Sequence, residues 1–287
     1  MRLRSLLPTM MLLATACGGG DRSIIQNTGS DTMLDVAQAW AERYQTVDPT
    51  TAVAVSGGGS GTGIASMING TVDIANSSRA MSADEIESAR ANGNNPVEHI
   101  VGHDALAVYL HRDNPISMMT LAQLEQIYGE GGTADTWSAL GVTVPGCASD
   151  EIVRVSRQNS SGTYAYFQEA ALGEREYKLG ARSMNGSSEV VDLVENTPCA
   201  IGYSGLAYAT EGVKMPCLST TEGAVCVAPS IESALDGSYP IARPLFMYTA
   251  GEPEGAVAQY LNWIQSQEGQ CILTELGYAP REVVTCS

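Results

Sequence analysis

Residues 51–77, TAVAVSGGGSGTGIASMINGTVDIANS, run from a β-rich segment through a glycine- and serine-rich loop and a short apolar segment into a second β-rich segment. We predict strands at 51–57 and 71–77, because β-branched residues favour strands. We predict a helix between them that ends at Asn69-Gly70, a pair that is typical of a helix C-terminus. A strand, a helix and a strand in succession are typical of an α/β fold.

The same alternation continues on both sides of this stretch. Further strands are predicted at 104–110 and 244–249, and helices at 121–128 and 256–264. Thr120 and Gln123 have the spacing of a capping box in front of the helix at 121–128. An N-terminal helix is predicted from apolar residues at helical spacing, namely Met33, Val36, Ala37, Trp40 and Tyr44. Short β-rich runs between amphipathic helices predict layers of the α/β class.

Three loops share one pattern, in which a strand is followed by Ser, Thr and Gly residues and then by the first turn of a helix. They are residues 28–32 (TGSDT), 57–63 (GGGSGTG) and 160–163 (SSGT). A helix N-terminus presents unpaired N–H groups and about half a positive charge, and therefore attracts an anion. Ser and Thr also cap helices in every kind of protein, so one such loop alone is explained by capping. Three together, with Arg157 at the end of the strand at 152–156, point to an anion site.

Several competing motifs are excluded by inspection. The chain has only two lysines, Lys178 and Lys214, and neither lies near a loop that resembles a phosphate-cradling P-loop. Thr62 stands where a nucleophile elbow requires glycine, and the loop at 57–63 lacks the spacing of a dinucleotide fingerprint. A catalytic role, a metal site and a cofactor are therefore not expected. The enzymatic alternative is a secreted hydrolase that uses Ser60 with His103 on a phosphoester or an acyl ester.

The length and the charge limit the class of protein further. The chain has 287 residues, which is typical of two domains, and no linker rich in Pro and Ser divides it. We therefore expect the chain to cross between the domains more than once. The 32 Asp and Glu residues outnumber the 15 Lys and Arg residues and give a net charge of −17. Such a surface repels nucleic acid and anionic lipid headgroups, so neither is an expected partner.

The N-terminus resembles an export signal. Residues 1–16 carry two arginines and then a run of about eleven mostly apolar residues, whereas about 20 are needed to span a bilayer. We expect residues 1–16 to be a signal peptide, Cys17 to be the site of lipid attachment, and residues 17–23 to be a tether. A plain signal peptide without lipidation is the alternative. The predicted location is the bacterial cell envelope, on its periplasmic or extracellular face.

The cysteine count agrees with lipidation of Cys17, because it leaves an even number of six in an oxidising compartment. Proximity in the sequence suggests Cys217 with Cys226 and Cys271 with Cys286, which leaves Cys147 to pair with Cys199. Six cysteines allow 15 pairings, so the others stay open.

Six segments together resemble the phosphate-binding proteins of bacterial phosphate-uptake ABC transporters, which have the type II periplasmic binding-protein fold. The similarity covers nearly the whole chain after the signal segment. The segments are 29–44 (GSDTMLDVAQAWAERY), 55–81 (VSGGGSGTGIASMINGTVDIANSSRAM), 121–130 (LAQLEQIYGE, followed by Trp137), 157–163 (RQNSSGT), 200–209 (AIGYSGLAYA) and 239–249 (YPIARPLFMYT).

The resemblance implies two α/β lobes with mixed sheets, joined by crossover hinge strands, that close on an anion stripped of its water. Lobe I would comprise residues 24–104 and 245–287, and lobe II residues 105–244. The implied function is to bind inorganic phosphate for delivery to the permease subunits of an ABC importer, as a monomer that meets the membrane only through its lipid. Binding of sulfate, molybdate, tungstate or arsenate, or a sensor or adhesin that retains the fold, are the alternatives.

Carried over residue by residue, the implied phosphate-binding residues are Ser30, Asp31, Thr32, Ser60, Ser78, Arg157, Ser161, Gly162 and Thr163. The sequence departs from the family at one of them, because some members place at Ser78 an aspartate that accepts the proton of the bound phosphate. Asp31 is the only acidic residue in the three loops. It is therefore the candidate for that acceptor, although a first-turn aspartate that favours the helix dipole is an equal explanation.

Overall fold

The computed structural model describes residues 23–286. The predicted signal peptide, Cys17 and all but the last residue of the predicted tether lie outside the described residues. The described strands are β1 (Ser23–Gly29), β2 (Thr51–Ser56), β3 (Ile74–Ser77), β4 (Val97–His111), β5 (Met118–Thr120), β6 (Val153–Arg157), β7 (Arg182–Met184), β8 (Ala200–Gly205), β9 (Val213–Lys214), β10 (Cys217–Ser219) and β11 (Ala242–Thr249).

The helices lie between these strands, as the sequence predicts for an α/β chain. They are α1 (Leu34–Val47), α2 (Ser60–Ile68), α3 (Ala83–Ala91), α4 (Leu121–Tyr128), α5 (Gly162–Leu172), α6 (Ser187–Glu195), α7 (Ile231–Leu235), α8 (Gly255–Ile264) and α9 (Gln267–Glu275), with 3₁₀ turns η1 (Asp31–Met33), η2 (Ser138–Leu140) and η3 (Leu206–Tyr208).

The predicted elements are found, and the two largest shifts lie at the starts of two strands. The helix at 121–128 and its capping box are confirmed, as is the helix end at Asn69-Gly70. The strand predicted at 71–77 begins only at Ile74, because the N–H of Thr71 bonds to the carbonyl of Ser66 and closes the end of α2. The strand predicted at 104–110 is longer and covers β4, from Val97 to His111.

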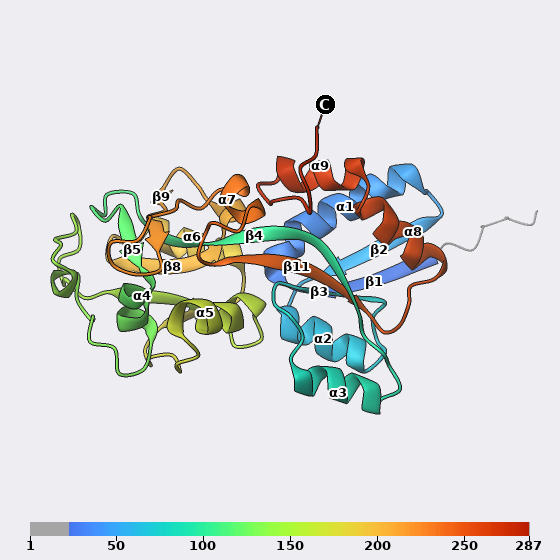
Figure 1. The fold of residues 1–287 in the computed structure, drawn as a ribbon, viewed down its shortest axis with the longest axis horizontal. Helices are drawn as coiled ribbons and strands as arrows, with labels where there is room; N and C mark the ends of the chain where they lie inside the picture. Colours follow the sequence, from blue (N-terminus) through green and yellow to red (C-terminus); the bar gives the residue numbers. More distant parts are fainter. Residues whose placement is uncertain (1–22, 287) are drawn as a thin grey trace, which may run out of the picture.

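One mixed sheet runs through the molecule in the order β2-β1-β3-β11-β4-β8-β6-β7. The outer pairs β1–β2, β1–β3, β6–β8 and β6–β7 are parallel, whereas β11 and β4 pair in antiparallel fashion at the centre. The first part of β4 pairs with β11, up to Ala105, and its last part pairs with β8, from Leu106 to Leu110. The two central strands therefore connect the two halves of the molecule (Figure 1).

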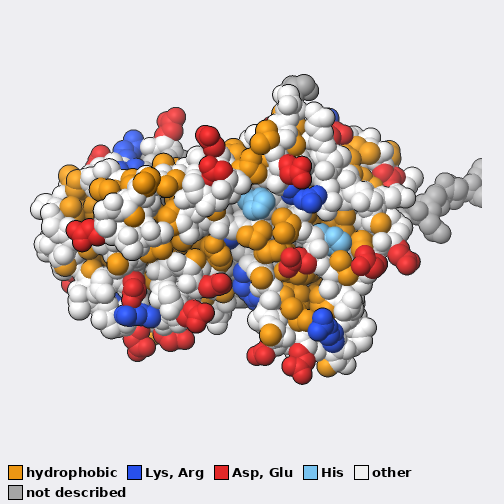
Figure 2. All heavy atoms as spheres, in the orientation of Figure 1, with side chains coloured by type: hydrophobic (Ala, Val, Ile, Leu, Met, Phe, Trp, Pro, Cys, Tyr) orange, Lys and Arg blue, Asp and Glu red, His pale blue; other side chains and the backbone are white. Residues whose placement is uncertain are grey.

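Each half has its own hydrophobic core, which makes the structure two-lobed. The core of the first lobe includes Trp40, Met247 and Tyr260, where α1 and α8 cover the sheet. The core of the second lobe includes Trp137 and Phe167. Figure 2 shows that the surface narrows between the lobes, and that acidic side chains are scattered over the face in view.

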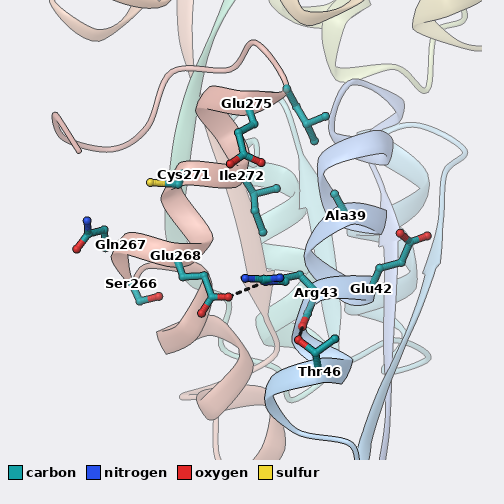
Figure 3. A pocket seen from close by; sticks show the side chains of 11 residues that line it. Ala39, Glu42, Arg43, Thr46, Ser266, Gln267, Glu268, Cys271, Ile272 and Glu275 are labelled. Atoms are coloured by element: carbon teal, nitrogen blue, oxygen red, sulfur yellow. Dashed lines mark hydrogen bonds and ion pairs between the residues drawn. The ribbon is translucent and has the colours of Figure 1, made fainter. Parts of the chain in front are cut away.

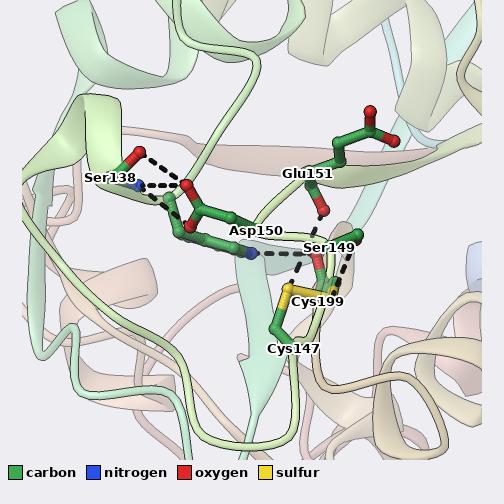
Figure 4. Close-up of a disulfide and its surroundings, with 7 residues drawn as sticks. Ser138, Cys147, Ser149, Asp150, Glu151 and Cys199 are labelled. Atoms are coloured by element: carbon green, nitrogen blue, oxygen red, sulfur yellow. Dashed lines mark hydrogen bonds between the residues drawn. A yellow bond between two sulfur atoms is a disulfide. The ribbon is translucent and has the colours of Figure 1, made fainter.

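Three disulfides join the six cysteines as predicted, namely Cys147–Cys199, Cys217–Cys226 and Cys271–Cys286. The bond between Cys147 and Cys199 fastens a loop of the second lobe to the residue before β8, where the indole N–H of Trp137 donates to the carbonyl of Cys199 (Figure 4). The bond between Cys271 and Cys286 ties the C-terminal segment to α9.

Candidate functional site

The three loops predicted to bind an anion meet between the two lobes. Here loop 1 is residues 28–32, loop 2 is residues 57–63 and loop 3 is residues 160–163. The N–H of Gly59 in loop 2 donates to the carbonyl of Gly29 in loop 1 at 2.9 Å, and the N–H of Gly61 donates to the carbonyl of Ser160 in loop 3 at 2.9 Å. Thr32 and Thr163 join loop 1 to loop 3 through a hydroxyl–hydroxyl bond of 2.8 Å. The loops therefore form one cluster.

Loops 2 and 3 each lead directly into an α-helix, and loop 1 leads into a 3₁₀ turn. Helix α2 begins at Ser60 and α5 begins at Gly162, so the N-terminal N–H groups of both helices lie in the cluster. Loop 1 continues into η1 before α1 begins at Leu34, one residue later than the Met33 helix that the sequence predicts. Two full helix dipoles and one short turn thus face the same point.

Helix capping explains the hydroxyl-bearing residues of only one of the three loops. The hydroxyl of Ser161 accepts from the N–H of Thr163 at 3.2 Å, which is an ordinary N-cap bond. Ser30 and Gly59 make no such cap. The hydroxyl of Ser60 instead accepts from the N–H of Ser78 at 3.0 Å. Capping alone therefore accounts for loop 3 and not for loops 1 and 2.

Gly162 is a position where the two lobes touch. A Cβ atom there would collide with the hydroxyl of Ser60 and would lie 2.7 Å from that of Ser78, whereas van der Waals contact begins at about 3.4 Å. Ser60 and Ser78 are themselves fully buried. The absence of a side chain at residue 162 is what lets the N-terminus of α5 approach the serines of the first lobe.

Arg157 ends β6 and directs its guanidinium into the cluster. One terminal nitrogen donates to the hydroxyl of Ser187 at 2.9 Å, and the other donates to the carbonyl of Asn185 at 2.8 Å and to Asp31 Oδ2 at 3.3 Å. Burial lowers the pKa of Arg157, the nearby charge of Asp31 raises it, and Arg243 lowers it. An arginine still stays charged in such a setting, so the cluster holds a fixed cation.

Two buried donors in this cluster are unused. Among residues 23–286, neither the hydroxyl of Ser30 nor Nε of Arg157 has a hydrogen-bond partner, although Ser30 is only 2% exposed and Arg157 only 1%. A buried donor without an acceptor costs about 1–3 kcal/mol. Both donors therefore need an acceptor, and the oxygen atoms of a bound anion would supply one.

Asp31 is the one carboxylate of the three loops. Its Oδ1 accepts from the N–H of Gly58 at 2.9 Å, so it holds loop 2 against loop 1 in addition to pairing with Arg157. The carbonyl of Asp31 also accepts from the hydroxyl of Tyr208 at 2.9 Å. The side chain is 12% exposed.

A second buried cation, Arg243 on β11, is not among the residues predicted from the sequence. It forms an ion pair of 2.8 Å with Asp104 on β4, and the two side chains are 0% and 1% exposed. Ser187 and Asn185, which hold Arg157, were missed as well. A signal for Arg243 exists, because it is a lone cation directly before the apolar run at 244–249 in a chain poor in basic residues.

The hydrolase alternative requires Ser60, as the nucleophile, to contact His103, as the general base. No hydrogen bond joins Ser60 to His103 in the part of the chain that the structure describes. His103 lies on β4, where its Nδ1 is 3.4 Å from the carbonyl oxygen of Pro280.

No cluster of three or more His, Cys, Asp or Glu residues that suits a metal occurs among residues 23–286. No helix in that range is long and apolar enough to cross a membrane.

Another groove, of 860 Å³, lies between α1 and α9 (Figure 3). Its basic residue Arg43 is paired with Glu268 at 2.7 Å, and Glu42 and Glu275 also line it. This excess of carboxylates repels an anion, in contrast to the loop cluster.

Comparisons with known proteins show which family this chain belongs to. A family described as "PBP superfamily domain" matches residues 14–268. The phosphate-binding protein PstS of Pseudomonas aeruginosa is 33% identical over 267 residues, which cover 89% of this chain and 82% of that protein. The PstS of Bacillus subtilis is 30% identical, with 97% of this chain and 93% of that protein covered.

Solved structures lead to the same family. A candidate substrate-binding protein of a phosphate ABC transporter from Clostridium perfringens, solved with bound phosphate, superposes with a TM-score of 0.78 at 26% identity, covering 91% of this chain and all of that one. An ABC-type phosphate transport receptor from Vibrio cholerae gives a TM-score of 0.71 at 25% identity, covering 89% and 99%. This chain therefore belongs to the PBP superfamily and, within it, to the family of the PstS phosphate-binding proteins.

Proposed function

We propose that this chain binds inorganic phosphate in the loop cluster between its lobes and delivers it to the permease of an ABC importer. The observation that carries the proposal is the pair of unused buried donors, Ser30 Oγ and Arg157 Nε, at the point where three N–H-rich loops meet. The names of the PstS relatives and the phosphate bound by the Clostridium perfringens protein support it.

Each loop has a distinct part in this proposal. Loop 1 supplies the hydroxyl of Ser30, loop 2 the N-terminus of α2 with the hydroxyl of Ser60, and loop 3 the N-terminus of α5. Arg157 supplies a buried guanidinium whose Nε–H is unused and which already contacts Asp31 of loop 1. The proposed phosphate-binding residues are Ser30, Asp31, Thr32, Ser60, Ser78, Arg157, Ser161, Gly162 and Thr163.

The energetics require all three loops. Removing an anion from water costs many kcal/mol, so each hydrating hydrogen bond has to be replaced. A hydrogen bond to a charged group contributes about 1.5–3 kcal/mol, and a helix N-terminus about 0.3–2 kcal/mol. Micromolar affinity takes about 8 kcal/mol net. One arginine cannot supply this free energy. The hydrogen-bond donors of three loops together can supply it beyond the cost of removing the anion from water.

We infer that Asp31 selects phosphate by its proton. Phosphate still carries a proton at neutral pH, and the carboxylate of Asp31 accepts that proton in a hydrogen bond, while fully ionised sulfate offers none and is repelled. The hydroxyl of Ser78 is a weaker acceptor for the phosphate proton than the carboxylate of Asp31, because the hydroxyl is neutral. Ser78 instead stands next to Ser60, with 3.4 Å between their hydroxyl oxygens.

The proposed lobes are residues 24–104 with 245–287, and residues 105–244. The separate hydrophobic cores support this division, since Val101 and Leu245 pack in one core and Leu106 and Ile241 in the other. Closure of the lobes brings loop 3 onto loops 1 and 2. The contact of Gly61 with Ser160 then seals the site from water, which strengthens every electrostatic interaction inside.

We also propose that the protein is exported and carries a lipid anchor at Cys17. The anchor keeps the monomeric binding protein beside its permease on the outer side of the membrane. Support comes from the sequence of residues 1–17 and from the even number of the other cysteines, which pair in three disulfides.

Thermal unfolding and calorimetry against phosphate, arsenate, sulfate, molybdate and tungstate test the function. Phosphate at 100 times its dissociation constant stabilises a one-site protein by about 2.7 kcal/mol. We expect this shift with phosphate and none with sulfate. A parallel incubation with chromogenic phosphoesters and acyl esters is expected to show no turnover. Stabilisation by another oxyanion alone, or hydrolysis of an ester, contradicts the proposal.

A further inference from the structure

Arg243 and Asp104 lie opposite each other on the two strands that connect the lobes. Asp104 of β4 and Arg243 of β11 are register partners in the antiparallel pair. Asp104 accepts from both Nε and Nη2 of Arg243, at 3.1 and 2.8 Å. Asp104 Oδ1 also accepts from the N–H of Leu206 at 3.3 Å. The pair is thus a fixed, fully buried, neutral unit at the crossover between the lobes.

The free side of the Arg243 guanidinium faces the loop cluster. Its Nη2 donates to the hydroxyl of Thr163 in loop 3 at 3.0 Å and to that of Thr32 in loop 1 at 3.3 Å. Its Nη1 donates to the carbonyl of Ser78 at 3.1 Å. The ring of Tyr166 on α5 lies 5.6 Å from the guanidinium carbon. One side chain therefore contacts three of the segments that converge on the site.

These contacts determine where the hydroxyl protons point. Both threonine hydroxyls accept from Arg243, and one of them donates to the other across 2.8 Å. The second hydroxyl then has a proton for which residues 23–286 offer no acceptor. A threonine hydroxyl has only one proton, so the arrangement leaves a single donor, and it lies between the loops.

We propose that Arg243 is a positioning residue that holds Thr32 and Thr163 together across the lobe boundary and leaves one of their hydroxyl protons directed at the bound anion. Asp104 neutralises the guanidinium, so Arg243 acts through the threonines and Arg157 remains the cation for the ligand. Because Thr32 and Thr163 come from different lobes, the three-residue contact forms only when the lobes are closed. This inference rests on the proposed function.

Arg243→Lys tests the inference, because lysine keeps a charge beside Asp104 but lacks the planar guanidinium that binds Asp104 through Nε while its Nη2 reaches both threonines. We expect phosphate affinity to fall by at least tenfold, mainly through faster dissociation, with the unfolding midpoint of the ligand-free protein close to wild type. Arg43→Lys, in the exposed pair with Glu268, is the matched control and should bind like wild type. Should Arg243→Lys not fold, Arg243→Gln with Asp104→Asn leaves no unpaired charge and is expected to show the same loss.

A double-mutant cycle separates positioning from a merely structural role. Replacing both Thr32 and Thr163 by valine removes the hydroxyls through which Arg243 acts, so Arg243→Lys should then change affinity by less than about threefold. A full tenfold loss in that background overturns the inference, as does a wild-type affinity and dissociation rate for Arg243→Lys alone. Failure of the wild-type protein to bind phosphate overturns the proposed function, and the inference with it.

Discussion

Replacement of Gly162 by alanine should abolish tight phosphate binding while leaving both lobes folded. The added methyl group would collide with Ser60 and would lie 2.7 Å from the hydroxyl of Ser78, and both serines belong to the opposite lobe. Because the clash arises only when the lobes meet, the open protein avoids it. Alanine is also a good residue for the first turn of a helix, so α5 itself is not weakened.

The size of the effect follows from these contacts. Relief of the clash moves the N-terminus of α5 away from Ser60, and overpacking of this kind costs about 1–3 kcal/mol. Lengthening even one hydrogen bond to the charged ligand costs a further 1.5–3 kcal/mol, approximately. The sum of about 2.5–6 kcal/mol corresponds to an affinity loss of about a hundredfold to ten-thousandfold.

Titration calorimetry of the purified variant with phosphate measures this loss, and thermal unfolding without ligand reports its stability. Gly251→Ala is the control, because a Cβ atom at Gly251 meets nothing within 4 Å. We expect the control to bind like wild type. If Gly162→Ala also binds phosphate within threefold of wild type, the lobes do not close on the ligand as described.

Four further predictions concern single groups. Arg157→Ala should weaken phosphate binding by more than tenfold in calorimetry, and an unchanged affinity would remove Arg157 from the site. Asp31→Asn should admit sulfate in the same assay, whereas continued exclusion of sulfate would place the proton acceptor elsewhere. Replacing Cys271 and Cys286 by serine opens a loop with a sequence separation of 15. The free energy of unfolding, measured with denaturant, should fall by up to about 3 kcal/mol. An unchanged unfolding midpoint would contradict this prediction. Glu85 on α3 is paired with Arg79 at 2.6 Å. Burial alone would raise the pKa of Glu85, but hydrogen bonds from Arg79 and from the backbone N–H of Ser82 lower it below the ordinary value of 4.5. The charged carboxylate therefore stabilises the fold at neutral pH, and this stabilisation is lost as the pH falls below 4.5. Glu85→Gln should therefore be less stable by up to about 1 kcal/mol at pH 7, with the difference closing in acid, and a constant difference would refute the assignment.

The local chemistry of the site was predictable from the sequence. Each of the three loops is a continuous run of residues, and the strand before it and the helix after it are visible as periodic patterns. The position of Arg157 at the end of a strand beside loop 3 followed from the same local order. The pairing of the six cysteines in the structure also agrees with their proximity along the chain.

The contacts across the crossover were not predictable in this way. Arg243 and Asp104 are 139 residues apart, and their pairing depends on the register of two antiparallel strands that no short turn connects. Asn185 and Ser187 meet Arg157 only because the segment before α6 folds back beside β6. Such contacts are properties of the assembled sheet, and a local sequence pattern carries no record of them.

A crystal structure of the protein with phosphate would show whether the three loops and Arg157 hold the anion between the lobes. We predict a tetrahedral anion between the lobes, with the hydroxyl of Ser30 and Nε of Arg157 both within hydrogen-bond distance of its oxygens and the N-termini of α2 and α5 facing it. An anion bound only in another groove, or a phosphate between the lobes that leaves both donors unpaired, would contradict the account.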